Sequence, residues 1–507
     1  MEALKTSLEE NIQQVKAALG NSGDIIIREI PLGSEGKIKA AILYTKGLVN
    51  TNSVHNFIIE SLMLDTRGTE FEQKVSSGQN ALQLIKDFAL TVGEIKDVTD
   101  FETLFTTLLS GKTIFLLDGY TQGFAIGLAG WENRGVTEPT SESVIRGPKE
   151  GFSETLFTNT ALIRRKIKDP NLWLESRKIG RVTKTDVAIM FIKGIVNDKV
   201  VEELRSRLDR IDIDGILESA YIEELIQDET YTPFPTVYNT ERPDVIAAGL
   251  LEGRVAIIID GTPFVLLVPA LFGQFNQAAE DYYQRADIGT LIRLLRYLSF
   301  FIALLAPSLY IAITTFHQEM IPTPLLISLA AQREGVPFPA FIEALVMEMT
   351  FEILREAGVR LPRAVGQAVS IVGALVIGQA AVEAGIISAA MVIVVSITAI
   401  ASFVFPSYNM AISVRILRFG LMGLAASFGL FGITLGLIAL VLHLCSLRSF
   451  GIPYMSPFAP FILADQKDML FRLPQWALFS RPRLISQKNV IREQNPPTPK
   501  PEPRKRL

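Results

Sequence analysis

Three glutamates spaced four residues apart could carry the chemistry of this chain. Glu348, Glu352 and Glu356 lie in AFIEALVMEMTFEILREAGVRLP (340–362), and Glu343 precedes them. Residues four apart share one face of a helix, so the three form a stripe, whereas Glu343 projects near the opposite side. A charge deep in a bilayer costs about 2.5–3.5 kcal/mol, so these acids do not face lipid at its centre. Three arrangements remain: an interfacial helix, a bundle-buried helix with paired acids, or an acidic lining that attracts cations.

The stripe lies among apolar segments that are long enough to span a membrane. A helix of about 20 residues crosses the roughly 30 Å core of a bilayer, where only helical backbone satisfies its own polar groups. We predict four spans, with residues 320–356 re-entrant or interfacial, in an all-α transmembrane bundle over residues 291–447. The predicted spans are residues 297–316, 364–382, 386–405 and 419–446.

The number of spans conflicts with the distribution of charge. Four spans keep both termini in the cytosol, together with the basic, Pro-rich tail over residues 448–507, as the positive-inside rule requires. They also place Arg360 and Arg415 outside, against that rule. A crossing by residues 340–356 would move these arginines inside but the tail outside.

Gly432 and Gly436 place two small residues four apart in the last predicted span. Small residues let helix backbones approach closely. The pair could pack helices within one subunit or between subunits, and the sequence leaves both open.

The head that precedes the bundle contains one unit twice. AAILYTKGLVN (40–50) aligns with VAIMFIKGIVN (187–197), and GKTIFLLDGYTQGFAI (111–126) aligns with GRVAIIIDGTPFVLLV (253–268). Short aliphatic runs indicate buried strands, and the segments between them have helical spacing. We therefore predict a duplicated α/β head, with one module and its leading helix over residues 1–145 and a second over 181–290.

Each module contains an Asp-Gly pair that predicts a hairpin. Asp118 and Gly119 follow TIFLL, and Asp260 and Gly261 follow VAIII. Asp-Gly between apolar strands is the strongest short hairpin signal. For this reason we interpret the apolar run 255–275 as a hairpin and not as a membrane span.

Two polar motifs in the head are candidates for structural or interaction roles. The first opens the connector predicted over residues 146–180, where gathered positive charge makes a binding loop the alternative. The second could anchor a turn by a salt bridge or bind a ligand. They consist of Arg146, Gly147, Pro148, Lys149, Glu150, Gly151 and Phe152, and of Glu241, Arg242, Pro243 and Asp244.

The composition indicates that one part of the chain lies in water and another in a membrane, and it argues against several classes of protein. The mean hydropathy of +0.30 is high for a soluble protein and low for a transporter. Residues 464–507 hold ten Lys/Arg and four Asp/Glu, so their charge is +6 and the rest of the chain is near −10. The only cysteine is Cys445, which excludes an intramolecular disulfide. We expect no catalytic, metal or cofactor site and no nucleic-acid partner.

Six stretches between about residues 110 and 485 share the motifs of one family. In the head they are RGPKEGFSETLFTNTALIRRKI (146–167), NTERPDVIAAGLLEGRVAIIIDGTP (239–263) and FGQFNQAAEDYYQR (272–285). In the membrane half they are FEILREAGVRLPRAVGQAVSIVGALVIGQAAVEAG (351–385), SVRILRF (413–419) and SLRSFGIPYMSPFAP (446–460). The chain resembles GerA-family A subunits, which belong to nutrient germinant receptors of spore-forming bacteria.

The resemblance implies a multi-pass protein of the spore inner membrane with a cytoplasmic head. It implies that the chain acts with a transporter-like B subunit and a lipoprotein C subunit to couple nutrient sensing to ion release. A lipid-embedded homo-oligomer would conduct monovalent cations, with Glu343, Glu348, Glu352 and Arg415 as candidates for the ion pathway. For Arg415 an interfacial anchor is the alternative. A SpoVA-type paralogue that amplifies ion release, or a non-conducting scaffold, is the alternative function, and an enzyme is not expected.

Overall fold

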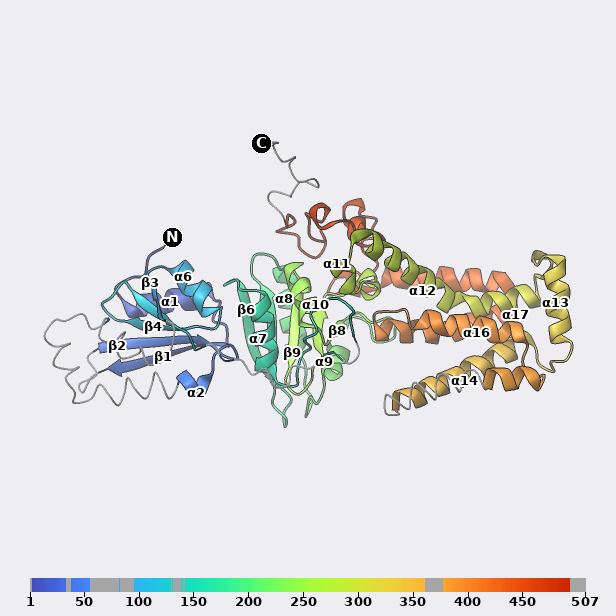
Figure 1. The fold of residues 1–507 in the computed structure, drawn as a ribbon, viewed down its shortest axis with the longest axis horizontal. Coiled ribbons are helices and arrows are strands. Elements are labelled where there is room, and N and C mark those ends of the chain that lie inside the picture. The colour runs from blue at the N-terminus through green and yellow to red at the C-terminus, as the bar shows by residue number, and fades with distance from the viewer. Residues whose placement is uncertain are drawn as a thin grey trace, which may run out of the picture. The chain divides into compact units, whose positions relative to one another are not determined.

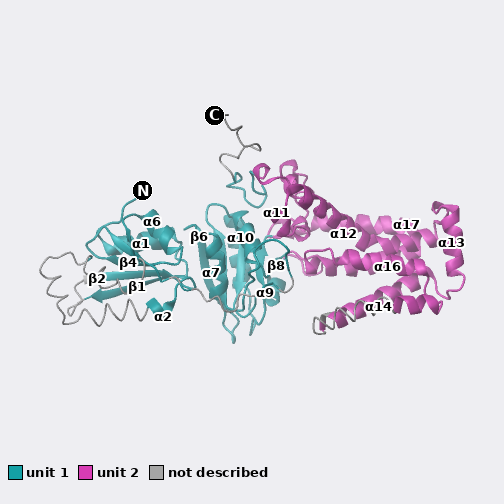
Figure 2. Cartoon of the chain, viewed as in Figure 1, with its two compact units in different colours: residues 1–227, 237–269, 479–496 teal, residues 228–236, 270–478, 497–507 magenta. Residues whose placement is uncertain are grey.

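The computed structural model describes residues 2–32, 38–54, 82, 95–128, 130, 138–139, 142–360 and 377–492 (Figure 1). The chain divides into two compact units (Figure 2). Unit 1 comprises Met1–Gln227, Val237–Pro269 and Phe479–Pro496, and unit 2 comprises Asp228–Thr236, Ala270–Leu478 and Pro497–Leu507.

The first sheet of unit 1 is antiparallel, with the strand order β1-β2-β4-β5-β3. Side chains of β2 alternate between two cores, because successive strand residues point to opposite faces. Ala41 and Leu43 pack with helices α1 and α6, whereas Ala40 and Ile42 join the core on the other face. The elements are α1 (Leu8–Ala18), β1 (Ile25–Leu32), β2 (Ile38–Thr45), α2 (Thr51–Ser53), β3 (Ile95–Val98), α6 (Phe101–Leu108), β4 (Thr113–Leu117) and β5 (Gly123–Ile126).

The second sheet of unit 1 has the corresponding order β6-β7-β9-β10-β8, so the two sheets are built alike. Its first helix and strand lie in residues 146–180, for which the sequence predicts a connector. Strand β6 has no aliphatic run, because buried side chains occur only near its two ends and its middle is polar, so the hydrophobic pattern does not reveal it. The elements are α7 (Leu156–Lys166), β6 (Leu172–Ile179), β7 (Thr185–Ile192), α8 (Asp198–Asp209), α9 (Ser219–Ile226), β8 (Tyr238–Thr240), α10 (Pro243–Leu251), β9 (Val255–Ile259) and β10 (Val265–Val268).

Both Asp-Gly pairs lie in turns between paired antiparallel strands, where the glycine has a positive φ of 86° at Gly119 and 93° at Gly261. Each aspartate also caps a helix from a distance. Asp118 Oδ1 accepts from the backbone amide of Leu8, and Asp260 Oδ1 accepts from that of Leu156, both at 2.9 Å. Leu8 and Leu156 are the first residues of α1 and α7, whose amides have no partner inside the helix. The same capping contact therefore recurs in both halves of unit 1.

A buried salt bridge joins the two halves of unit 1. Arg164 of α7 donates from Nε and Nη2 to Asp24 at 2.7 and 3.0 Å, and from Nη1 to the Leu172 carbonyl at 2.7 Å. The side chains of Arg164 and Asp24 are 0% and 1% exposed. Trp173 Nε1 donates to the Ala18 carbonyl at 3.3 Å beside this pair. Bidentate geometry and full burial make the bridge a specific connection between the two sheets.

Unit 2 is mainly helical, and its α12 packs against α14, α16 and α17. Among the described residues, two helices, α12 and α17, are long and apolar enough to cross a membrane, while α16 is a shorter apolar helix. The span predicted at 364–382 falls largely in residues 361–376, outside the described residues. The helices are α11 (Glu280–Tyr283), α12 (Ala286–Thr315), α13 (Thr323–Arg333), α14 (Ala340–Arg360), α16 (Ala389–Ser402) and α17 (Tyr408–Ser446), followed by strands β11 (Arg448–Ser449) and β12 (Ile452–Pro453).

Helix α17 reverses direction at Gly429, which has a φ of 61° and a ψ of −141°. An added Cβ at Gly436 would lie 2.6 Å from Leu421 Cδ2. In a straight helix these two residues would be about 22 Å apart. Gly432 likewise lies against Leu424. The predicted span 419–446 is therefore divided, and the two glycines pack one arm of α17 (residues 408–428) against the other (430–446) within the same chain.

We predict that Asp24→Asn destabilises unit 1 by about 3–5 kcal/mol, because Arg164 would stay buried without its countercharge. Hydrogen exchange of the β6 and β7 amides in the full chain measures the free energy of opening. Asp186→Asn is the matched control, since its pair with Lys178 is 48% and 64% exposed and should contribute less than about 1 kcal/mol. Equal effects of the two variants would contradict this prediction.

Candidate functional site

The two polar motifs of the head meet in unit 1. Arg242 donates from Nη1 to the Glu142 carbonyl at 3.1 Å and from Nη2 to the Pro148 carbonyl at 3.0 Å. The amide of Phe152 donates to the Glu241 carbonyl at 2.8 Å. These contacts hold the loop of residues 142–152 against the turn between β8 and α10. Segments almost 100 residues apart thus form one polar cluster, which we call the loop–turn cluster (residues 142–152 and 238–244).

Arg242 is buried and holds this cluster through both of its terminal nitrogens. Its guanidinium forms a salt bridge with Asp244 at 2.7 Å, with side chains 3% and 7% exposed. Pro243 follows at the first position of α10, where a missing amide does no harm. The arrangement is that of a turn anchored by a salt bridge, and it leaves the guanidinium no accessible face for a ligand.

The positive charge gathered near residues 146–166 is also partly neutralised within the chain. Lys149 pairs with Glu138 at 3.5 Å, and Glu150 pairs with Lys166 and, at 3.7 Å, with Arg165. Arg146 and Gly147 are exposed, whereas Phe152 is buried. The motif therefore has a structural role in unit 1, and its use as a binding loop stays a prediction.

Two glutamates contact successive residues of β8, the edge strand of the second sheet. Glu142 accepts a hydrogen bond from the Thr240 hydroxyl, and Glu223 accepts from Asn239 Nδ2 at 3.2 Å. Burial raises the pKa of Glu142 to about 7, against the opposing effects of the Thr240 hydrogen bond and the Arg242 charge. Burial likewise raises the pKa of Glu223 to about 7. Neither residue stood out in the sequence, because nothing in a polar loop or a helix reveals which acid becomes desolvated.

In unit 2, Glu348 of α14 is paired with Arg418 of α17. The distance from Oε2 to Nη1 is 2.5 Å, and both side chains are 1% exposed. Glu348 therefore has no contact with solvent in this chain. Its partner was not among the predicted site residues, because a pair separated by 70 residues leaves no local signal.

Glu352 and Arg415, both predicted, are brought together. Arg415 Nε donates to Glu352 Oε1 at 2.9 Å, and a second bond from Nη2 makes the pair bidentate. The side chains are 17% and 20% exposed, so this pair is more accessible than Glu348 and Arg418. Arg355 lies 3.7 Å from Glu352 and above the rings of Phe351 and Phe403.

Glu343 lies apart from this group. Its Oε2 accepts from the amide of Ser388, at the N-terminus of α16, at 2.9 Å. Its Oε1 lies 3.4 Å from Arg333 Nε of α13. The four residues predicted for the ion pathway thus occupy three separate contacts, and their role in ion movement stays a prediction.

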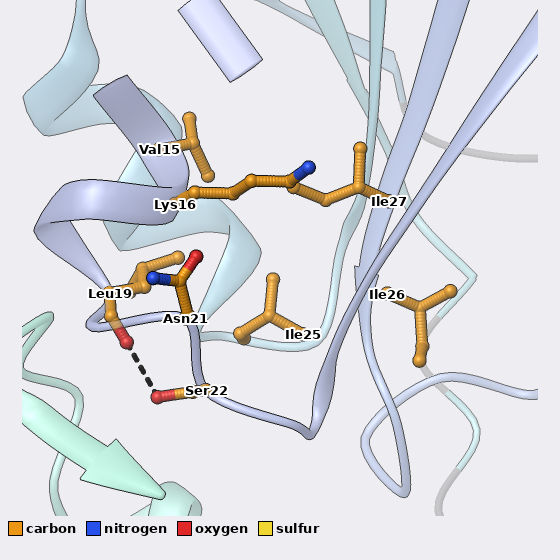
Figure 3. A pocket seen from close by; sticks show the side chains of 8 residues that line it. All are labelled: Val15, Lys16, Leu19, Asn21, Ser22, Ile25, Ile26 and Ile27. Carbon is orange, nitrogen blue, oxygen red and sulfur yellow. Dashed lines mark hydrogen bonds between the residues drawn. The ribbon is translucent and has the colours of Figure 1, made fainter. Parts of the chain in front are cut away.

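Other site chemistry is limited in the part of the chain that the structure describes. No group of three His, Cys, Asp or Glu side chains there could hold a metal ion. A groove of about 310 Å³ between α1 and β1 is lined by Val15, Lys16, Leu19, Asn21, Ser22 and Ile25–Ile27 (Figure 3). None of the predicted site residues lies in this groove.

The raised pKa values of Glu142 and Glu223 make the stability of unit 1 depend on pH. The folded protein keeps both protons up to about pH 7, whereas the unfolded chain releases them near 4.5. Stability should therefore fall between these values as pH rises, and the loss should be complete above pH 7. The thermal unfolding midpoint, measured from pH 5 to 8, should decline less in Glu142→Gln/Glu223→Gln. Glu138→Gln, at a 48% exposed site, should keep the full slope, and an unchanged slope in the double variant would refute the assignment.

The chain is similar to known proteins over nearly its whole length. A family model described as Bacillus/Clostridium GerA spore germination protein matches residues 13–484. Spore germination protein KA of Bacillus subtilis (strain 168) is 53% identical over 498 residues, which are 98% of this chain and 90% of that protein. Spore germination protein GerLA of Bacillus cereus is 40% identical over 96% of this chain and 97% of its own length. The crystal structure of the N-terminal domain of the A subunit of the Bacillus megaterium spore germinant receptor GerK3 has 45% identity and a TM-score of 0.43, and covers 54% of this chain and 98% of that chain. The chain therefore belongs to the GerA family of spore germination proteins.

Proposed function

We propose that this chain is the A subunit of a spore germinant receptor and couples nutrient sensing to ion release as an oligomeric cation channel. Family membership over residues 13–484 supports the receptor assignment. The two long apolar helices of unit 2 support a location in a membrane. The observation that carries the channel assignment is the Glu352–Arg415 pair, which places charge inside a helical bundle at a partly exposed position.

The proposal includes the surroundings and partners of the chain. The chain lies in the lipid of the spore inner membrane with its head in the cytoplasm, as a multi-pass homo-oligomer that passes monovalent cations. It acts with a transporter-like B subunit and a lipoprotein C subunit, as A subunits of germinant receptors generally do. The head carries two copies of one module, an inference supported by the common strand order and the two equivalent helix caps.

One observation favours a second candidate, a non-conducting scaffold. Glu348, Glu352 and Glu343 all have cationic partners within the chain, so the stripe offers less free negative charge than a cation-selective ring needs. In this alternative the charged residues hold the bundle together and the ions pass elsewhere.

Currents across planar bilayers that contain the purified full chain distinguish the two candidates. A channel should give cation-selective currents, and Glu352→Gln should alter their conductance, because it removes the negative member of the partly exposed pair. The exchange Glu352→Arg/Arg415→Glu is the matched control, since it keeps an ion pair between the same two positions and should assemble like the unchanged chain. Silence from a folded oligomer would support the scaffold, and unchanged currents in Glu352→Gln would remove that residue from the pathway.

Spores that lack this chain separate a receptor subunit from a SpoVA-type amplifier. Deletion of a receptor subunit should abolish ion release in response to the nutrients it serves and leave other responses intact. Deletion of an amplifier should weaken the response to every nutrient. Potassium release measured over a panel of amino acids, sugars and nucleosides gives the answer, and an unchanged response throughout would count against both functions.

A further inference from the structure

Helix α12 contains a proline, Pro307, within its buried part. A helix is held by bonds from each amide to the carbonyl four residues earlier, and proline has no amide hydrogen to donate. The carbonyl of Ala303 therefore lacks its normal helical donor. Ala303 is 0% exposed, so water does not reach it from the surface. A buried carbonyl that lost its hydrogen bond would destabilise the helix at this point.

Arg418 supplies a donor to this carbonyl from another helix. Its Nε donates to the Ala303 carbonyl at 2.7 Å, while its Nη1 contacts Glu348 at 2.5 Å. One guanidinium thus joins α12, α14 and α17, and it donates to a backbone carbonyl and to a carboxylate at the same time. We call the contact of Ala303, Pro307, Glu348 and Arg418 the α12–α14–α17 junction.

The two bonds of the junction depend on each other. Without Glu348, Arg418 would be an uncompensated buried cation, and without Arg418, both Glu348 and the Ala303 carbonyl would lose their partners. The Ala303 carbonyl therefore keeps a donor only while α17 stays beside α12, with Arg418 held in place by Glu348 of α14.

We propose that Arg418 replaces the amide that Pro307 lacks, and that the α12–α14–α17 junction is a latch whose opening frees α12 to bend. When the latch is closed, α12 has a complete set of partners at Ala303. When α14 or α17 shifts, the Ala303 carbonyl and Glu348 lose Arg418 in the same step. This inference goes beyond the proposed function, since it holds whether the chain conducts ions or serves as a scaffold.

Hydrogen exchange of the full chain in detergent, followed by mass spectrometry, tests the latch. Arg418→Lys keeps the charge beside Glu348 but loses the planar guanidinium that reaches both partners. Exchange in residues 300–312 should rise about tenfold, the effect expected for a lost hydrogen bond to a charged group. Exchange around Glu348 should rise with it, because the two contacts open together. A rise in α12 alone would contradict the latch.

Pro307→Ala supplies the decisive second background, because it restores the missing amide. In this background Arg418→Lys should change exchange in residues 300–312 much less than it does with Pro307 present. An equal effect in both backgrounds would overturn the proposal. Arg415→Lys is the matched control on the same arm of α17, and it should leave residues 300–312 unchanged. If Arg418→Lys does not fold, Pro307→Ala alone still decides, since any loss of protection in α12 would refute the proposal.

Discussion

An ionised side chain that leaves water must find its countercharge inside the protein, and both units of this chain are organised by that requirement. In unit 1 the fully buried Arg164 and Asp24 connect the two sheets. In unit 2 Arg418 and Glu348 connect helices that are far apart in sequence. At the start of α12, Asp281 contacts both Arg293 and Arg296, with the carboxylate 1% exposed. Leaving one member of a buried pair without its partner destabilises a protein far more than replacing both members by apolar residues. Each pair therefore specifies which segments must meet.

The two halves of unit 1 use the same backbone solution at equivalent points. In each, an aspartate in a tight turn caps the first helix, and an asparagine inside that helix closes the preceding loop. Asn11 exchanges hydrogen bonds with Lys5, and Asn159 does the same with Ser153. The inter-sheet bridge has no such counterpart, because residue 16, which occupies the position of Arg164, is an exposed lysine. The shared contacts stabilise each half, and the unshared arginine joins them.

Local sequence patterns predicted the central strands and turns of the head. They did not predict which residues far apart in the sequence contact each other. Aliphatic runs, together with Asp118 and Asp260, identified the central strands and hairpins, because burial and turn geometry act over a few residues. Arg164 and Asp24 are separated by 140 residues, so the sequence around either residue does not predict their contact. The reversal at Gly429 was missed because a glycine with positive φ looks, in sequence, like a glycine that packs helices. Glu348 was predicted as a candidate for the ion pathway, but its partner Arg418 lies 70 residues away, so no local pattern indicates that the two side chains meet.

The reversal at Gly429 has a consequence for membrane topology. Residues 408–428 and 430–446 are each long enough, at about 1.5 Å per residue, to approach the thickness of a bilayer core. A hairpin of this kind adds two crossings or none, so it leaves the parity of the crossing count unchanged. The contacts of Ser413 with the Pro233 carbonyl and of His443 with Thr232 likewise place the two ends of α17 beside the same short segment. A single glycine therefore folds the last apolar segment back on itself, so that the segment enters and leaves at the same end of the helical unit.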